Sequence, residues 1–197
     1  MGAERDDDAG KTKTVQEERH KARFYPLWLA GKSMREFRLQ RRTNLKKLTS
    51  ADLAALAGQA QQSPRLRANS NLHAELTDPI QRLAIAMEPD TLILPHRHPH
   101  TWEVLTALRG RFTVLVFDEA GRVAERAELG VDTSVVEIPA GGWHAVLSRD
   151  VGAVIFEVKH GPYAPIGDAD VAAWGKGRTA AELNAWYAEA RPGDTLA

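Results

Sequence analysis

The sequence contains no cysteine, which excludes disulfide bridges and thiolate metal ligands. It also has no apolar run of about eighteen residues, the length that marks a membrane-spanning helix, so we expect no membrane partner. Residues 1–24 lack the apolar segment of a secretory signal. We therefore predict a cytoplasmic location.

Residues 1–47 contain more basic than acidic side chains, although the formal net charge of the whole chain is zero. A basic arm could contact nucleic acid, but this one carries no known nucleic-acid-binding motif. We expect no nucleic-acid partner and interpret the arm as a solvated, partly disordered extension with some helix. Its aromatic cluster, Phe24–Ala30, suggests a surface for a second copy of the chain, and we expect a homodimer.

A length of 197 residues fits one domain with appendages. We predict a charged extension over residues 1–47, a β-rich domain with a leading helix over 48–174, and a helix with a tail over 175–197. Each of the two helices is predicted from a capping box, which pairs Thr49 with Asp52 and Thr179 with Glu182.

The middle of the chain carries short β-rich segments separated by turn signals, and its helices lie at the ends. This order favours an antiparallel barrel or sandwich over a parallel α/β sheet. The predicted strands cover residues 81–86, 91–94, 102–105, 112–117, 135–138 and 153–158.

Histidines are concentrated in one short segment. His96 and His98 are two residues apart, so on an extended strand their side chains point the same way. Glu103 begins the next β segment, and His144 follows a Pro–Gly turn. Imidazoles with one carboxylate suit Fe, Mn, Ni or Zn. These four residues are predicted to hold one divalent transition metal, with His100 at the rim.

Both segments match the two sequence motifs of the cupins. The first, HxH(x)3–4E(x)6G, runs from His96 to Gly110, and the second, PxG(x)2H, runs from Pro139 to His144. More narrowly, the chain resembles the WbuC family of cupin metalloproteins. The resemblance implies an all-β fold, a double-stranded β-helix or jelly-roll barrel. It covers roughly residues 48–174 and is strongest at residues 65–73, 78–82, 95–99 and 156–163.

Other polar residues share one strand face. Arg67, Asn69, Asn71 and His73 have the same parity and could line the barrel interior, or could form the solvated face of an edge strand. Glu157 and Lys159 could be an acid–base pair or a surface ion pair; the family's EVK-x-GPY ending favours a catalytic role. Predicted substrate-binding residues are Arg67, His73, Arg82, His100 and Tyr163.

The function is predicted only as a class. A small-molecule enzyme of the isomerase, epimerase or lyase type is one possibility, and an Fe-dependent dioxygenase is another. A third is a metal-assisted sensor or binding barrel without turnover. The WbuC resemblance implies a sugar or sugar-nucleotide ligand linked to bacterial surface polysaccharide.

Overall fold

The computed structural model describes residues 45–196. The predicted disorder, the cluster Phe24–Ala30 and most of the basic arm lie outside these residues. The described elements are α3 (Ser50–Gln62), β1 (Arg67–Asn71), β2 (Ile80–Met87), β3 (Glu103–Arg109), β4 (Phe112–Phe117), β5 (Val123–Leu129), β6 (Val135–Ile138), β7 (Trp143–Ser148), β8 (Ala153–His160), η3 (Asp168–Asp170), η4 (Ala173–Gly175) and α4 (Ala180–Glu189).

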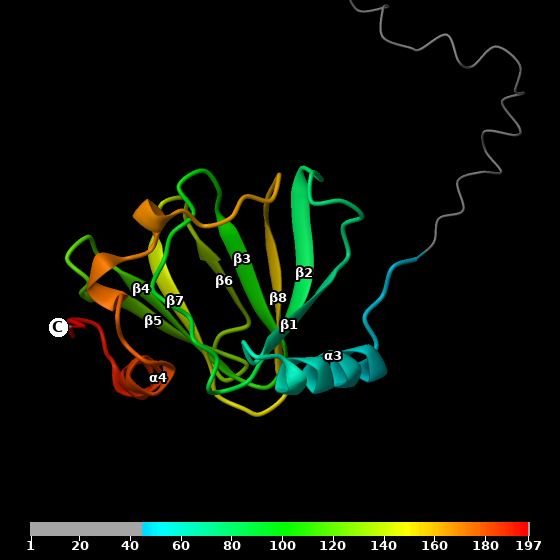
Figure 1. Ribbon diagram of the computed structural model, residues 1–197, viewed down its shortest axis with the longest axis horizontal. Helices are drawn as coiled ribbons and strands as arrows, with labels where there is room; N and C mark the ends of the chain where they lie inside the picture. The colour runs from blue at the N-terminus through cyan, green and yellow to red at the C-terminus, as the bar shows by residue number, and fades with distance from the viewer. Residues whose placement is uncertain (1–44, 197) are drawn as a thin grey trace, which may run out of the picture. The chain divides into compact units, whose positions relative to one another are not determined.

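The strands form two antiparallel sheets, as Figure 1 shows. One sheet has the order β1-β2-β8-β3-β6, and the other has the order β5-β4-β7. The chain passes from one sheet to the other between β3 and β4, between β5 and β6, between β6 and β7, and between β7 and β8. This alternation is that of a double-stranded β-helix, and it confirms the predicted all-β fold class.

Strand alternation separates the inner and outer faces of each sheet. Between the sheets lies an apolar core that includes Leu105, Phe112, Val114 and Ile155. The outer face of the five-stranded sheet packs against α3 through Ala84, Ala86 and Val154, with Leu56 and Ala60 from the helix. The outer face of the three-stranded sheet packs against α4 through Leu115, Phe117 and Leu147, with Leu183 and Tyr187 from the helix.

Both predicted helices begin at their capping boxes. Thr49 caps α3 with Asp52 as its reciprocal partner, and Thr179 caps α4 with Glu182 in the same way. No helix in the described part of the chain is long and apolar enough to cross a membrane.

The strand predicted at residues 91–94 is wrong, because this segment joins no ladder. Its backbone carbonyls bind side chains of α4 instead of a neighbouring strand. Asn184 donates to the Thr91 carbonyl (3.1 Å) and Tyr187 donates to the Ile93 carbonyl (3.0 Å). Two strands, β5 and β7, were not predicted. In β5 the charged residues Glu125, Arg126 and Glu128 dilute the apolar pattern.

The two motif glycines occupy positions that other residues adopt at a cost. Gly110 ends β3 with φ +72°, and Gly141 lies in the turn before β7 with φ +79°. Both values fall in the left-handed region, which favours glycine. A Cβ on Gly110 would also lie 2.8 Å from the Cβ of Ala153. These turns set the positions of Glu103 at the far end of β3 and of His144 at the start of β7.

Candidate metal centre

His96 and His144 lie side by side although they come from the two separate sequence motifs. The backbone N–H of His96 donates to the His144 carbonyl (2.9 Å), and the N–H of His144 donates to the His96 carbonyl (2.8 Å). On the other side, the Arg97 N–H donates to the Asp170 carbonyl (3.0 Å). The extended segment that carries His96 and His98 is thus fixed from both sides.

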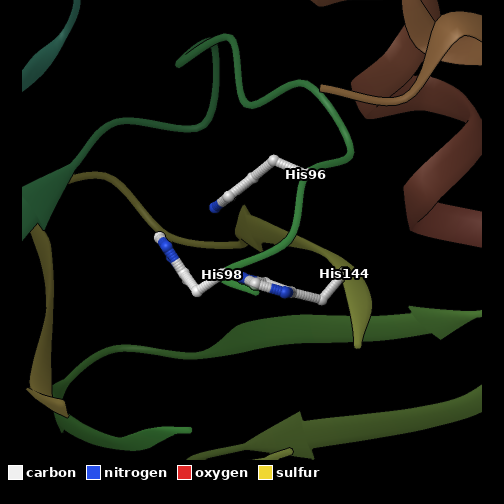
Figure 2. A group of neighbouring side chains, drawn as sticks. All are labelled: His96, His98 and His144. Atoms are coloured by element: carbon white, nitrogen blue, oxygen red, sulfur yellow. The ribbon is translucent and has the colours of Figure 1, made fainter. Parts of the chain in front are cut away.

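Three imidazoles converge at this point, as Figure 2 shows. The ring centroids of His96 and His144 are 4.4 Å apart, and that of His98 lies 5.2 Å and 5.6 Å from them. One nitrogen of each ring lies within 4.8 Å of the corresponding nitrogens of the other two. Such a group of histidines could hold a metal ion.

Glu103 faces the same point from the opposite sheet. Its Oε2 atom lies 3.1 Å from Nε2 of His144 and 3.6 Å from Nε2 of His98. Glu103 is buried, and Oε2 has no hydrogen-bond partner. An unpaired buried carboxylate oxygen is costly, and a cation bound here would satisfy it. The donor set therefore fits a divalent transition metal.

Backbone carbonyls select the tautomer of two of the imidazoles. Nδ1 of His96 lies 2.9 Å from the Leu94 carbonyl oxygen, and Nδ1 of His144 lies 3.0 Å from that of Gly142. A carbonyl can only accept, so the proton of each neutral ring is on Nδ1. The lone pair is then on Nε2, the atom that a metal would bind.

All three histidines have depressed pKa values. Burial, followed by the neighbouring charge of His144, lowers the pKa of His96 to about 3. Burial, followed by the charge of Lys159, lowers the pKa of His98 to about 3. Burial also lowers the pKa of His144. The rings are therefore neutral near pH 7, as a metal ligand must be.

Glu157 and Lys159 adjoin this centre on the inner face of β8. Lys159 Nζ lies 2.7 Å from Glu157 Oε1 and 3.8 Å from Glu103 Oε1. Burial, followed by the charge of Glu103, raises the pKa of Glu157. Burial lowers the pKa of Lys159, but the charges of Glu157 and Glu103 outweigh it, so the net pKa is raised. The pair is not on the sheet surface.

A cavity of about 430 Å³ opens from this centre. Among the predicted substrate-binding residues, Arg67, His73 and Tyr163 line it. His100 is exposed in a turn, and Arg82 pairs with Asp78 (3.4 Å); neither lines the cavity. Asn69 and Asn71 do line it, but both are exposed and β1 is the edge strand of its sheet, so the face that carries Arg67 and His73 borders the cavity and is also open to solvent.

The structure also adds cavity residues that were not predicted. Arg65, Leu76 and Ile166 line the cavity, in addition to apolar strand residues such as Ile85 and Val146. Arg65 has the same parity as Arg67, which is a signal for it, but Leu66 between them has φ +54°. That left-handed residue interrupts the extended chain, so parity alone could not have placed Arg65.

Comparisons with known proteins give one family and several distant folds. A domain family of unknown function (DUF6016) matches residues 48–129, which is less than half of the chain and includes His96, His98 and Glu103 but not His144. The comparison with curated protein sequences found no match.

Solved structures with a similar arrangement include KdgF from Halomonas sp., at 13% identity and a TM-score of 0.41, over 52% of this chain and 84% of that one. The TT1209 protein from Thermus thermophilus matches at 20% identity and a TM-score of 0.44, over 59% and 97%. A recombinant oxalate oxidase in complex with glycolate matches at 15% identity and a TM-score of 0.44, over 54% of this chain and 57% of that one. These likenesses concern the fold alone.

Proposed function

We propose that this chain is a metal-dependent cupin enzyme that binds one divalent transition metal through His96, His98, Glu103 and His144. The convergence of three neutral imidazoles on a buried carboxylate oxygen without a hydrogen-bond partner carries this proposal. Four protein ligands on an octahedral ion leave two positions for a small molecule. Bound there, the metal would act as a Lewis acid on the oxygen atoms of the substrate.

Glu157 and Lys159 are the proposed acid–base pair. Both line the cavity, and Lys159 reaches Glu157 and Glu103 at once. In this arrangement one group can hold a proton next to the metal-bound end of a substrate while the other compensates its charge. This placement favours an enzyme over a binding barrel, which would need the metal ligands but no such pair.

The proposed reaction class is isomerisation, epimerisation or elimination on a sugar or a sugar nucleotide. Support for the sugar comes from the resemblance to the WbuC family at residues 65–73, 78–82, 95–99 and 156–163, and with it a link to bacterial surface polysaccharide. The exposed position of His100 favours an open metal site over a purely structural one, because His100 does not close the site as a further ligand.

Elemental analysis of the freshly purified full chain tests the proposal, with His98→Ala and His100→Ala compared side by side. We expect about one metal ion per chain in the wild type, loss of the metal in His98→Ala, and retention in His100→Ala. Equal metal content in the two variants, or none in the wild type after reconstitution, would overturn the proposal. Iron as the resident element would direct the assays to the dioxygenase alternative.

A further inference from the structure

One wall of the cavity is rich in hydrogen-bond donors and lies away from the metal ligands. We call it the β1 wall and define it as Arg65, Arg67, Asn69, Asn71 and His73, all of which line the cavity. Arg67 is half-buried, while Arg65, Asn69 and Asn71 are more open to solvent. The Asn69 side-chain amide donates to Asn71 Oδ1 (2.9 Å), which orients the two amides along the wall.

The two arginines of this wall form no ion pair in the described part of the chain, although the charge of Glu157 acts on Arg67. The two carboxylates that line the cavity, Glu103 and Glu157, both contact Lys159. Burial, followed by the charge of Arg65, lowers the pKa of Arg67. An oxyanion between the two arginines would offset both the burial of the Arg67 charge and its repulsion from Arg65.

His73 adds an independent sign of a ligand. It is 4% exposed, and its Nε2 atom has no hydrogen-bond partner. Nδ1 lies 3.0 Å from both the backbone N and the backbone O of Arg82. The carbonyl already accepts from the Leu72 N–H (2.8 Å), whereas the Arg82 N–H can only donate. Nδ1 is thus the acceptor, and the ring proton is on Nε2.

His73 therefore has the tautomer opposite to that of His96 and His144. Its Nε2–H is a buried donor that lacks an acceptor, not a lone pair for a metal. His73 lies beside Arg82, and the next residue on β2, Gln81, pairs with Lys159 on β8. Lys159 in turn pairs with Glu103 on β3. The donor is thus level with the metal centre, across the sheet from it.

We propose that the cavity takes a ligand with two polar ends. One end chelates the metal, and the other end carries an oxyanion, a carboxylate or a phosphate, that binds Arg67 and Arg65. The Nε2–H of His73 donates to a ligand oxygen. This inference rests on the proposed metal function and adds the substrate class. A sugar acid with a second anionic group, or a sugar phosphate, has this chemistry.

Three probes with the same six-carbon chain test the proposal on the metal-loaded full chain. D-Gluconate offers a chelating hydroxy acid at one end only. 6-Phospho-D-gluconate adds a phosphate at the far end, and D-glucarate adds a carboxylate there. Calorimetric titration at fixed ionic strength should show that at least one of the two doubly anionic probes binds about tenfold more tightly than gluconate. The probe that gains identifies the oxyanion.

Variants locate the gain. Arg67→Gln should abolish the preference for the doubly anionic probe over gluconate, and Arg67→Lys should keep part of the preference. Arg149→Gln removes an exposed arginine that does not line the cavity, so the preference should persist. Equal affinity for the three probes, a preference that survives Arg67→Gln, or no binding by protein with one metal per chain would overturn the inference. Failure to take up metal would instead remove the proposed function.

Discussion

His96 and His144 exchange both of their backbone hydrogen bonds, so the two sequence motifs are joined by main chain before any metal binds. The side chains project from a framework that is already paired, and each ring is oriented by a carbonyl of its own segment. A site prepared in this way loses little conformational entropy when it takes up an ion. Metal affinity should therefore depend on the ligands more than on folding of the site.

Metal removal should destabilise the protein, because the ion binds the folded state. Without the ion, Glu103 Oε2 has no partner. At a free metal concentration one hundred times the dissociation constant, the expected gain in unfolding free energy is about 2.7 kcal/mol. Scanning calorimetry with metal and with EDTA measures the difference. In Glu103→Gln the metal affinity should fall at least about tenfold.

Glu125→Gln is the matched control, because Glu125 is exposed on β5 and does not line the cavity. It should retain the full thermal shift. The assignment of Glu103 as a metal ligand would be contradicted if EDTA did not change the unfolding temperature of the wild type. It would also be contradicted if the thermal shift were as large in Glu103→Gln as in Glu125→Gln.

The tautomers of the cavity histidines are directly measurable. Proton–nitrogen correlation spectra of histidine-labelled full chain, loaded with zinc, should show the ring proton of His96 and of His144 on Nδ1. The ring proton of His73 should be on Nε2, because the Arg82 N–H donates to Nδ1. Exposed His100 should populate both tautomers. A His73 proton on Nδ1 would remove the buried donor from the proposed ligand site.

The features that could be predicted from sequence were those set by local chemistry. His96, His98 and Glu103 lie on one connection and at the start of one strand, so their spacing in the sequence indicates their proximity. The turn at Gly141 positions His144. The parity of Glu157 and Lys159 also placed them on one face. The structure brings these residues together around one cavity, with His144 supplied by the other sheet.

Features that depend on tertiary contacts were missed. Segment 91–94 has strand-forming residues, but side chains of α4 occupy its carbonyls. Arg82 was predicted to bind substrate, and it follows Gln81 directly on β2. Adjacent strand residues point to opposite faces, and Gln81 is the one that lines the cavity. Once either residue is known to face the cavity or the outside, the alternation decides the direction of the other from the sequence alone.

The capping box of α4 should contribute measurably to stability. Thr179 accepts a hydrogen bond from the Glu182 N–H (3.3 Å), and Glu182 accepts from the Thr179 N–H (2.8 Å). Thr179→Ala should lower the unfolding free energy by about 1 kcal/mol, measured by urea denaturation. Thr179→Ser keeps the hydroxyl and should stay close to the wild type. A loss of the same size in both variants would show that the hydroxyl is not responsible.

Arg126 should be the stronger support for the same helix. Its guanidinium donates to the carbonyls of Tyr187 (3.0 Å), Ala188 (3.0 Å) and Ala190 (2.6 Å), which end α4, and also contacts Glu128 through Nε (2.8 Å). These carbonyls have no partner within the helix. Arg126→Met keeps the aliphatic stem but leaves the carbonyls and Glu128 without their donor. We expect a loss of about 2–3 kcal/mol in unfolding free energy.

Arg122→Met is the matched control for Arg126→Met. Arg122 lies just before the same strand, but its guanidinium is largely exposed and only 3.9 Å from Asp118. Exposed ion pairs of this kind contribute about 0–1 kcal/mol, so urea denaturation should separate the two variants clearly. If Arg126→Met lost no more than Arg122→Met, water would satisfy the end of α4 as well as the guanidinium does. The helix would then be held on the three-stranded sheet by its apolar contacts, which include those of Leu183 and Tyr187.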